Sequence, residues 1–134
     1  MFFIDSWIWI EYFSDGHKYQ KAREIIERLK EDKGSISTIV LTEVRYRITQ
    51  RFGIHVANHL LQIVNSLSNL SILPVTSTIA VYAADLRAKY YSTKNQLSYA
   101  DAIHLATAIL SDCDVFYTGD PDFSGIEEIK IEIV

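Results

Sequence analysis

Residues 98–123 read SYADAIHLATAILSDCDVFYTGDPDF, a stretch in which a helical pattern is followed closely by a strand pattern. Residues 99–111 are apolar on most sides, which is typical of a helix buried inside a fold. The run VFYT at 115–118 is short and rich in branched and aromatic side chains, as in a buried strand. A buried helix that leads into a buried strand is the repeating unit of α/β proteins, so this stretch decides the fold class.

The rest of the chain repeats this alternation. Further strand-length apolar runs occur at residues 2–4, 35–37, 70–73 and 129–133. Helical periodicity and stop signals predict helices over residues 17–32, 39–52, 55–68 and 76–91. Together these patterns predict a three-layer α/β/α fold with a mostly parallel central sheet of about five strands.

The composition narrows the class of protein. The 134 residues suit one domain spanning 1–134, and 49% hydrophobic with 22% charged residues is an ordinary globular balance. The single cysteine, Cys113, excludes an internal disulfide framework, and we expect it to be buried at the edge of a strand. No apolar run is long enough to span a membrane, and the apolar N-terminus lacks the features of a signal sequence. We therefore expect a cytoplasmic protein.

Four acidic residues are expected to meet at the carboxyl edge of the sheet, where α/β folds bind their ligands. Asp5 ends the first strand, Glu43 lies early in the helix after the second, and Asp120 follows the fourth. Asp101 can join them if the helix at 99–111 runs antiparallel to the strands. Two helices separate the third and fourth strands, so either one helix runs across the sheet or residues 91–98 carry the chain back.

Each acid also has a purely structural explanation. Asp101 follows Ser98 by three residues, as the acid of a capping box does. Glu43 could pair with Arg47 one helical turn later. The Asp-Pro-Asp sequence at 120–122 suits a surface turn. One shared site accounts for all of these placements together, and we therefore favour the site.

A shared site of carboxylates predicts a bound divalent cation. Crowded carboxylates repel and raise one another's pKa, and a cation removes that conflict. Oxygen ligands favour Mg²⁺ or Mn²⁺, whereas no Cys/His set has the spacing of a zinc site. We expect His104, one turn after Asp101, to be a hydrogen-bonded histidine of the buried helix rather than a ligand. The formal net charge of −4 argues against a nucleic-acid partner unless these acids are committed to metal.

The order of four motifs resembles the PIN-domain ribonucleases, and among them the VapC toxins of toxin–antitoxin pairs. The motifs are FFIDS at 2–6, TIVLTEV at 38–44, SYADAIHLATA at 98–108 and YTGDPDF at 117–123. The third is the most specific, and the resemblance covers essentially the whole chain. It implies a parallel sheet with helices on both faces and Mg²⁺- or Mn²⁺-dependent cleavage of RNA.

The resemblance also implies roles for individual residues. It assigns catalysis to four acids, namely Asp5, Glu43, Asp101 and Asp120. Of these, Asp5, Asp101 and Asp120 are the expected metal ligands. Three further residues are expected to support the site: Thr118, which matches a hydroxyl residue before the fourth acid, Asp122, which matches a more variable acid, and Ser6. Family members of this kind also imply a homodimer and a small VapB-like antitoxin whose tail occupies the cleft.

Two other functions stay open at this point. A PIN nuclease of housekeeping RNA processing would carry the same motifs. A non-enzymatic receiver-like module would also gather acids at strand ends, but it would need an adjacent acidic pair and a lysine just after a late strand. Here Asp5 is followed by Ser6, and Lys130 lies inside the last apolar run.

Basic side chains near the acids and aromatic side chains near the N-terminus also have expected roles. Candidate phosphate contacts precede or follow the acids along the helices: Arg45, Arg47, Arg51, Arg87, Lys89 and Lys94. The N-terminal aromatic residues are expected to pack a short helix into the core rather than to form a partner surface: Trp7, Trp9, Tyr12 and Phe13.

Overall fold

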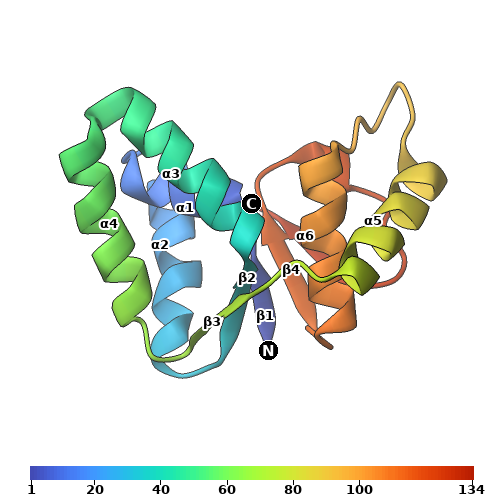
Figure 1. The fold of residues 1–134 in the computed structure, drawn as a ribbon, viewed down its shortest axis with the longest axis horizontal. Coiled ribbons are helices and arrows are strands. Elements are labelled where there is room, and N and C mark those ends of the chain that lie inside the picture. The colour runs from blue at the N-terminus through green and yellow to red at the C-terminus, as the bar shows by residue number, and fades with distance from the viewer.

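The computed structural model describes residues 1–134, and its core is a sheet of five strands (Figure 1). The strands are β1 (Phe2–Ile4), β2 (Gly34–Ser37), β3 (Leu70–Leu73), β4 (Val115–Thr118) and β5 (Lys130–Ile133). They lie in the order β3-β2-β1-β4-β5, and every neighbouring pair is parallel. The predicted α/β/α fold is confirmed, and the sheet is parallel throughout.

The helices follow the predicted pattern with small differences at their ends. They are α1 (Ser6–Phe13), α2 (Tyr19–Glu27), α3 (Thr38–Phe52), α4 (Ile54–Ser66), α5 (Ser77–Tyr90) and α6 (Tyr99–Leu110), with 3₁₀ turns η1 (Arg28–Lys30) and η2 (Pro121–Phe123). The continuous helix predicted over 17–32 is wrong in its limits. It begins only at Tyr19, and its last turn tightens into η1 because the unpaired carbonyls of a helix end favour shorter bonds.

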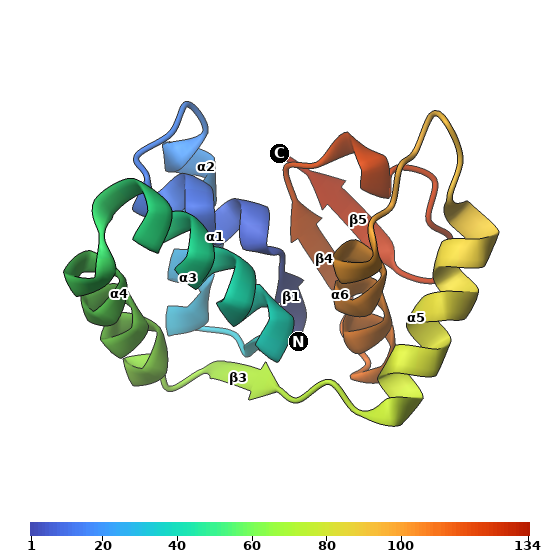
Figure 2. The same cartoon turned by 45° about the horizontal axis from the view of Figure 1, so that its top comes forward.

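The strand order explains which helices cover which face of the sheet. Right-handed crossovers from β1 to β2 to β3 run in one direction and place α1 to α4 on one side. The chain then returns to β4 beside β1, so α5 and α6 cover the opposite side (Figures 1 and 2). The direction of winding reverses between β1 and β4. The carboxyl ends of these two strands therefore flank the crevice in which such folds bind ligands.

The arrangement of α5 and α6 resolves the problem of two consecutive helices. Figure 2 shows the chain crossing after β3 to the far end of α5, which then rises beside α6. Residues 91–98 make the turn between the two helices at the carboxyl edge. They are fixed there because Gln96 N donates to Asp122 Oδ1 (3.2 Å) and Asn95 Nδ2 donates to Ser124 O (2.9 Å), both just after β4. Helix α6 thus starts at the carboxyl edge, as the placement of Asp101 requires.

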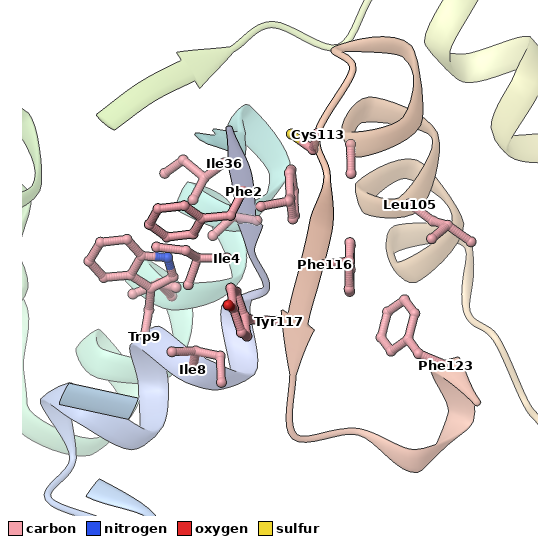
Figure 3. Close-up of a cluster of buried hydrophobic side chains, with 14 of the residues drawn as sticks. Phe2, Ile4, Ile8, Trp9, Ile36, Leu105, Cys113, Phe116, Tyr117 and Phe123 are labelled. Atoms are coloured by element: carbon pink, nitrogen blue, oxygen red, sulfur yellow. The ribbon is translucent and has the colours of Figure 1, made fainter. Parts of the chain in front are cut away.

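The core fills both sides of β1 and β4, because successive strand residues point to opposite faces. On the α6 side, Phe3 stacks on Phe116 with ring centroids 5.0 Å apart, and Phe116 contacts Phe123 of η2 (Figure 3). On the other side, Trp9 of α1 is buried near Ile4. Burial of each such aromatic side chain stabilises the fold by about 1.5–3 kcal/mol.

Two expectations about buried side chains are confirmed. Trp7, Tyr12 and Phe13 are partly buried against the core, and Trp9 is fully buried, so the N-terminal aromatic residues pack α1. Cys113 is buried immediately before β4, with its Sγ 3.3 Å from Ser35 Oγ. None of the helices has the length and apolar character that a bilayer crossing requires.

Candidate active site

Asp5 occupies the end of β1, at the reversal point of the sheet. Its backbone N–H donates to Tyr117 O of β4 (3.0 Å), which continues the strand pairing into the site. Its side chain caps α1: Oδ1 accepts from Ser6 N at 2.8 Å, while Thr118 Oγ1 donates to Oδ2 at 2.7 Å. Asp5 is only 3% exposed. The carboxylate is therefore buried and held in one orientation.

Thr118 joins Asp5 to Asp120 across the two strand ends. Its hydroxyl donates to Asp5 and also accepts from Asp120 N at 3.0 Å. Asp120 Oδ1 in turn accepts from Asp122 N at 2.9 Å and caps η2, so the turn predicted for 120–122 is present. Asp122 itself accepts from Gln96 N. Asp122 thus fixes the 91–98 loop, whereas Asp120 lies two residues after the end of β4 and is held there by Thr118.

Asp101 is held by the capping box expected from the sequence. Its Oδ2 accepts from Ser98 N at 3.1 Å, and its own N–H donates to Ser98 Oγ at 3.1 Å. No protein donor reaches Oδ1, so the capping box orients this carboxylate without occupying it fully. Burial raises the pKa of Asp101, and the negative charge of Asp120 raises it further.

Glu43 reaches the site from the second turn of α3 through His104. The Nε2 of His104 hydrogen-bonds Glu43 Oε1, and its Nδ1 lies 3.0 Å from Ser37 Oγ. His104 is fully buried and lies 4.0 Å from Asp5 Oδ1. Glu43 therefore pairs with His104 and not with Arg47, and the expectation of a hydrogen-bonded buried histidine is confirmed.

The charges in this network act on one another. Burial is the main cause that raises the pKa of Asp5 to about 6; His104 and Thr118 lower this pKa, and the charges of Asp101 and Glu43 raise it by smaller amounts. Burial alone would lower the pKa of His104, but Glu43, Asp5 and Asp101 raise it. Burial alone would raise the pKa of Glu43, but His104 and Ser6 lower it. Asp5, Glu43, Asp101 and Asp120, which we call the acidic site, therefore lie within electrostatic reach of one another.

The donor set of the acidic site fits a hard divalent cation. All of its ligating atoms are carboxylate oxygens, and His104 is the only salt-bridge partner of any of the four residues. No three Asp, Glu, His or Cys side chains converge closely enough to form a ready-made metal group, and each of the four carboxylates already takes part in a hydrogen bond within the protein. Mg²⁺ typically uses one or two carboxylates and keeps several waters, which such a loose set of oxygens accommodates.

The structure separates the candidate phosphate contacts into residues engaged elsewhere in the protein and residues in or beside the 91–98 loop. Arg45 donates to Asn58 Oδ1 (2.8 Å), and Lys89 pairs with Glu128 (3.3 Å). Arg51 lies over the ring of Phe52 at the far end of α3. Arg87 lies beside the 91–98 loop, and its Nε donates to Leu97 O (3.1 Å). Lys94 lies exposed in the same loop without an ion pair.

Sequence reasoning missed one member of the network, Ser37. It ends β2, caps α3 by accepting from Val40 N (3.2 Å), and contacts His104 from the opposite side to Glu43. The available signal was a serine at the junction of a predicted strand and a predicted helix, which is a typical N-cap.

Comparisons with known proteins agree with this architecture. The model of the PIN domain family matches residues 2–129. No curated protein sequence matches the chain. Among solved structures, VapC20 of Mycobacterium tuberculosis, described as a toxin that cleaves the sarcin–ricin loop, is similar with a TM-score of 0.79 and 21% identity, covering 97% of this chain and 99% of that one.

Two further structures contain toxin–antitoxin proteins. A toxin–antitoxin complex from Klebsiella pneumoniae has a TM-score of 0.74 and 28% identity, covering 96% of this chain and 95% of that one. VapBC2 from Rickettsia felis, bound to a fragment of its promoter DNA, has a TM-score of 0.75 and 20% identity, covering 99% and 98% respectively.

Proposed function

Since the chain belongs to the PIN-domain family, we propose that it is a Mg²⁺- or Mn²⁺-dependent endoribonuclease and the toxin of a toxin–antitoxin pair. The observation that carries the proposal is the acidic site itself. Its carboxylates lie at the reversal point of the sheet, influence one another's pKa, and have no lysine or arginine to neutralise them. Membership of this family leaves the alternative of a receiver-like module without support.

In this proposal Asp5, Asp101 and Asp120 would hold the metal. A bound divalent ion would supply Lewis-acid stabilisation of the negative charge that develops on the phosphodiester. Thr118 and the N–H of Ser6 keep the Asp5 carboxylate oriented throughout. No covalent nucleophile is required, because the oxygen of a water molecule forms the new bond to phosphorus while the bond from phosphorus to the leaving oxygen of the RNA breaks.

Glu43 or Asp120 would take the proton from the attacking water. For Glu43, the hydrogen bond from His104 favours the ionised carboxylate, which is the form that a general base needs. For Asp120, Oδ1 accepts from Asp122 N, which leaves Oδ2 without a hydrogen-bond donor in the protein.

The direct test is RNA cleavage by the purified chain with Mg²⁺, with Mn²⁺ and with EDTA. We expect cleavage only with metal, and its loss in both Asp5→Asn and Asp101→Asn. Asp85→Asn is the matched control, because Asp85 is exposed on α5 and outside the network. Cleavage that persists in EDTA, or that survives both site variants, contradicts the proposed chemistry.

The toxin assignment is supported by the similarity to toxin–antitoxin proteins and by apolar side chains left for a partner to cover. On α3 and α4 these are Phe52, Ile54, Val56 and Ile63, which are 38–47% exposed. We propose a small VapB-like antitoxin as that partner, with a homodimer of this chain in the cytoplasm as the active form. Co-expression with the short reading frame beside the gene, followed by size-exclusion chromatography and a cleavage assay, tests it. A housekeeping nuclease would have no neighbour that binds and inhibits it.

A further inference from the structure

Beside the acidic site, Arg87 lies between two exposed tyrosine rings. Its guanidinium carbon is 4.4 Å from the ring centroid of Tyr91 and 4.2 Å from that of Tyr99. Tyr91 is 49% exposed and Tyr99 is 73% exposed, although both are large apolar side chains. We call these three residues the tyrosine–arginine stack. Nothing in the proposed cleavage chemistry uses it.

The stack is fixed in place before any ligand arrives. Arg87 Nε donates to Leu97 O (3.1 Å), and Tyr91 N donates to the carbonyl of Arg87 (2.9 Å). The intervening loop is anchored by Gln96 to Asp122. These bonds fix the guanidinium on which both rings pack, so the rings lose less conformational freedom when a ligand stacks on them than free rings would, which favours binding.

The stack and the acidic site share one scaffold. Tyr99 is the first residue of α6, and Asp101 lies in the same helical turn. Asp122 makes a second link: it accepts from the 91–98 loop, which carries Leu97, and its own N–H donates to Asp120 of the acidic site. Residues two apart on a helix are separated by about 200° around its axis. Tyr99 and Asp101 therefore leave the first turn of α6 on different sides, so an RNA strand cut at the acidic site would have to bend around this turn to reach the Tyr99 ring.

The aromatic rings and the guanidinium of the stack are suited to binding an unpaired nucleobase. Unpaired nucleobases stack on aromatic rings and on guanidinium planes, whichever base they carry. Arg87 has no carboxylate partner, so its Nη groups are free to contact a phosphate. The net charge of −4 weakens binding through the phosphate backbone, whereas stacking does not depend on overall charge.

We propose that the tyrosine–arginine stack binds an unpaired base of single-stranded RNA a few nucleotides from the bond that is cut. The inference rests on the proposed function, because it takes RNA as the substrate. It goes further by assigning a base-binding subsite to Tyr91, Arg87 and Tyr99 and by requiring an unpaired nucleotide at one position of the substrate.

Binding in the absence of metal tests this subsite separately from cleavage. The probes are fluorescent single-stranded RNA oligomers in EDTA, in which one base at a time is replaced by an abasic site. Tyr99→Ala should weaken binding of the intact oligomer roughly 5- to 150-fold, the usual contribution of one base–aromatic stack. Tyr99→Phe should bind like the unsubstituted protein, because it keeps the ring.

Two comparisons separate a base-binding role from a structural one. Leu110→Ala is the control, since Leu110 is an apolar side chain of α6 that is 46% exposed but lies at the opposite end of that helix from Tyr99. It should leave binding unchanged within about twofold, which is the spread expected of surface changes. One abasic position should weaken binding to the unsubstituted protein and have no further effect on Tyr99→Ala.

The inference is overturned if Tyr99→Ala binds RNA like the unsubstituted protein, if no abasic position depends on Tyr99, or if the unsubstituted protein binds none of the oligomers in EDTA. Loss of binding that only parallels a fall in thermal stability also overturns it. Cleavage that depends on metal but not on Tyr99 would leave the proposed function intact while removing the subsite.

Discussion

The acidic site is buried at Asp5, half-buried at its other three acids and assembled from distant parts of the sequence, whereas the tyrosine–arginine stack beside it is more exposed and comes from one local segment. Thr118 and Asp5 are 113 positions apart, and Glu43 and His104 are 61 apart. In the stack, Arg87 and Leu97 are only 10 positions apart. The acidic site therefore depends on the whole fold, while the stack depends on the turn between α5 and α6.

This difference separates two kinds of contribution. Asp5 and Asp101 carry charge where burial disfavours it, so they reduce the stability of the metal-free fold. The stacked tyrosines are uncharged and sit at the surface, so their removal should change affinity more than stability. Changes in the two regions should be distinguishable by measuring activity and stability together.

The largest expected effect is at Asp5. Asp5→Asn should lower the cleavage rate by on the order of 10²–10³, as for removal of one preorganised charged group. It should also raise the thermal midpoint in EDTA, because it removes a carboxylate whose ionisation burial opposes. Added Mn²⁺ should stabilise the unsubstituted protein and not the variant. A lower midpoint in EDTA would show that Asp5 is needed for folding rather than for chemistry.

The same carboxylate should make stability depend on pH. Its pKa is about 6 in the native state, against the ordinary value of 3.8 for an aspartate in the unfolded chain. Below pH 3.8 the group is protonated in both states and its contribution to stability is complete. As the pH rises through about 6, that contribution is lost, and the total loss is about 3 kcal/mol. The measurement is urea unfolding in EDTA at each pH, with Asp5→Asn as the reference; identical profiles would contradict the assignment.

His104 tests whether the buried network acts through Glu43. His104→Ala should lower cleavage about 10- to 100-fold, as is typical for residues that orient a catalytic ligand. His104→Gln should recover part of the rate, since its amide N–H can donate to Glu43. The acidic limb of the pH–rate profile should move to higher pH in His104→Ala, because the pKa of Glu43 rises without its partner. A rate loss with an unchanged pH profile would indicate a packing role only.

The smallest expected effect concerns the junction of the acidic site with α1. A Cβ at Gly119 would lie 2.2 Å from the ring of Trp7, so Gly119→Ala must displace one of them. We expect a loss of stability of about 1–3 kcal/mol together with slower cleavage, since Asp120 is the next residue. Gly53→Ala is the reference: it has open space but φ of +89°, so it should lower stability without affecting cleavage. Normal cleavage by Gly119→Ala would show that the strand end tolerates movement.

Local patterns predicted the elements because each is encoded within a few residues. The five apolar runs became the five strands, and Ser98 with Asp101 formed the expected capping box. Contacts across the fold were less predictable. The choice of His104 rather than Arg47 as the partner of Glu43 depends on how α3 and α6 face each other over β2, which no periodicity records. The role of Asp122 likewise depends on where residues 91–98 turn.

The single buried thiol gives this fold a built-in reporter of its own opening. Burial is the main cause that raises the pKa of Cys113, next to Ser35 and immediately before β4. A thiol that is both covered and protonated does not react with alkylating agents until the strand edge separates. The rate at which an alkylating reagent modifies the chain therefore counts opening events at the sheet that supports Asp5 and Asp120. Bound cation, RNA or partner protein should each slow that rate in proportion to how tightly it holds the closed form.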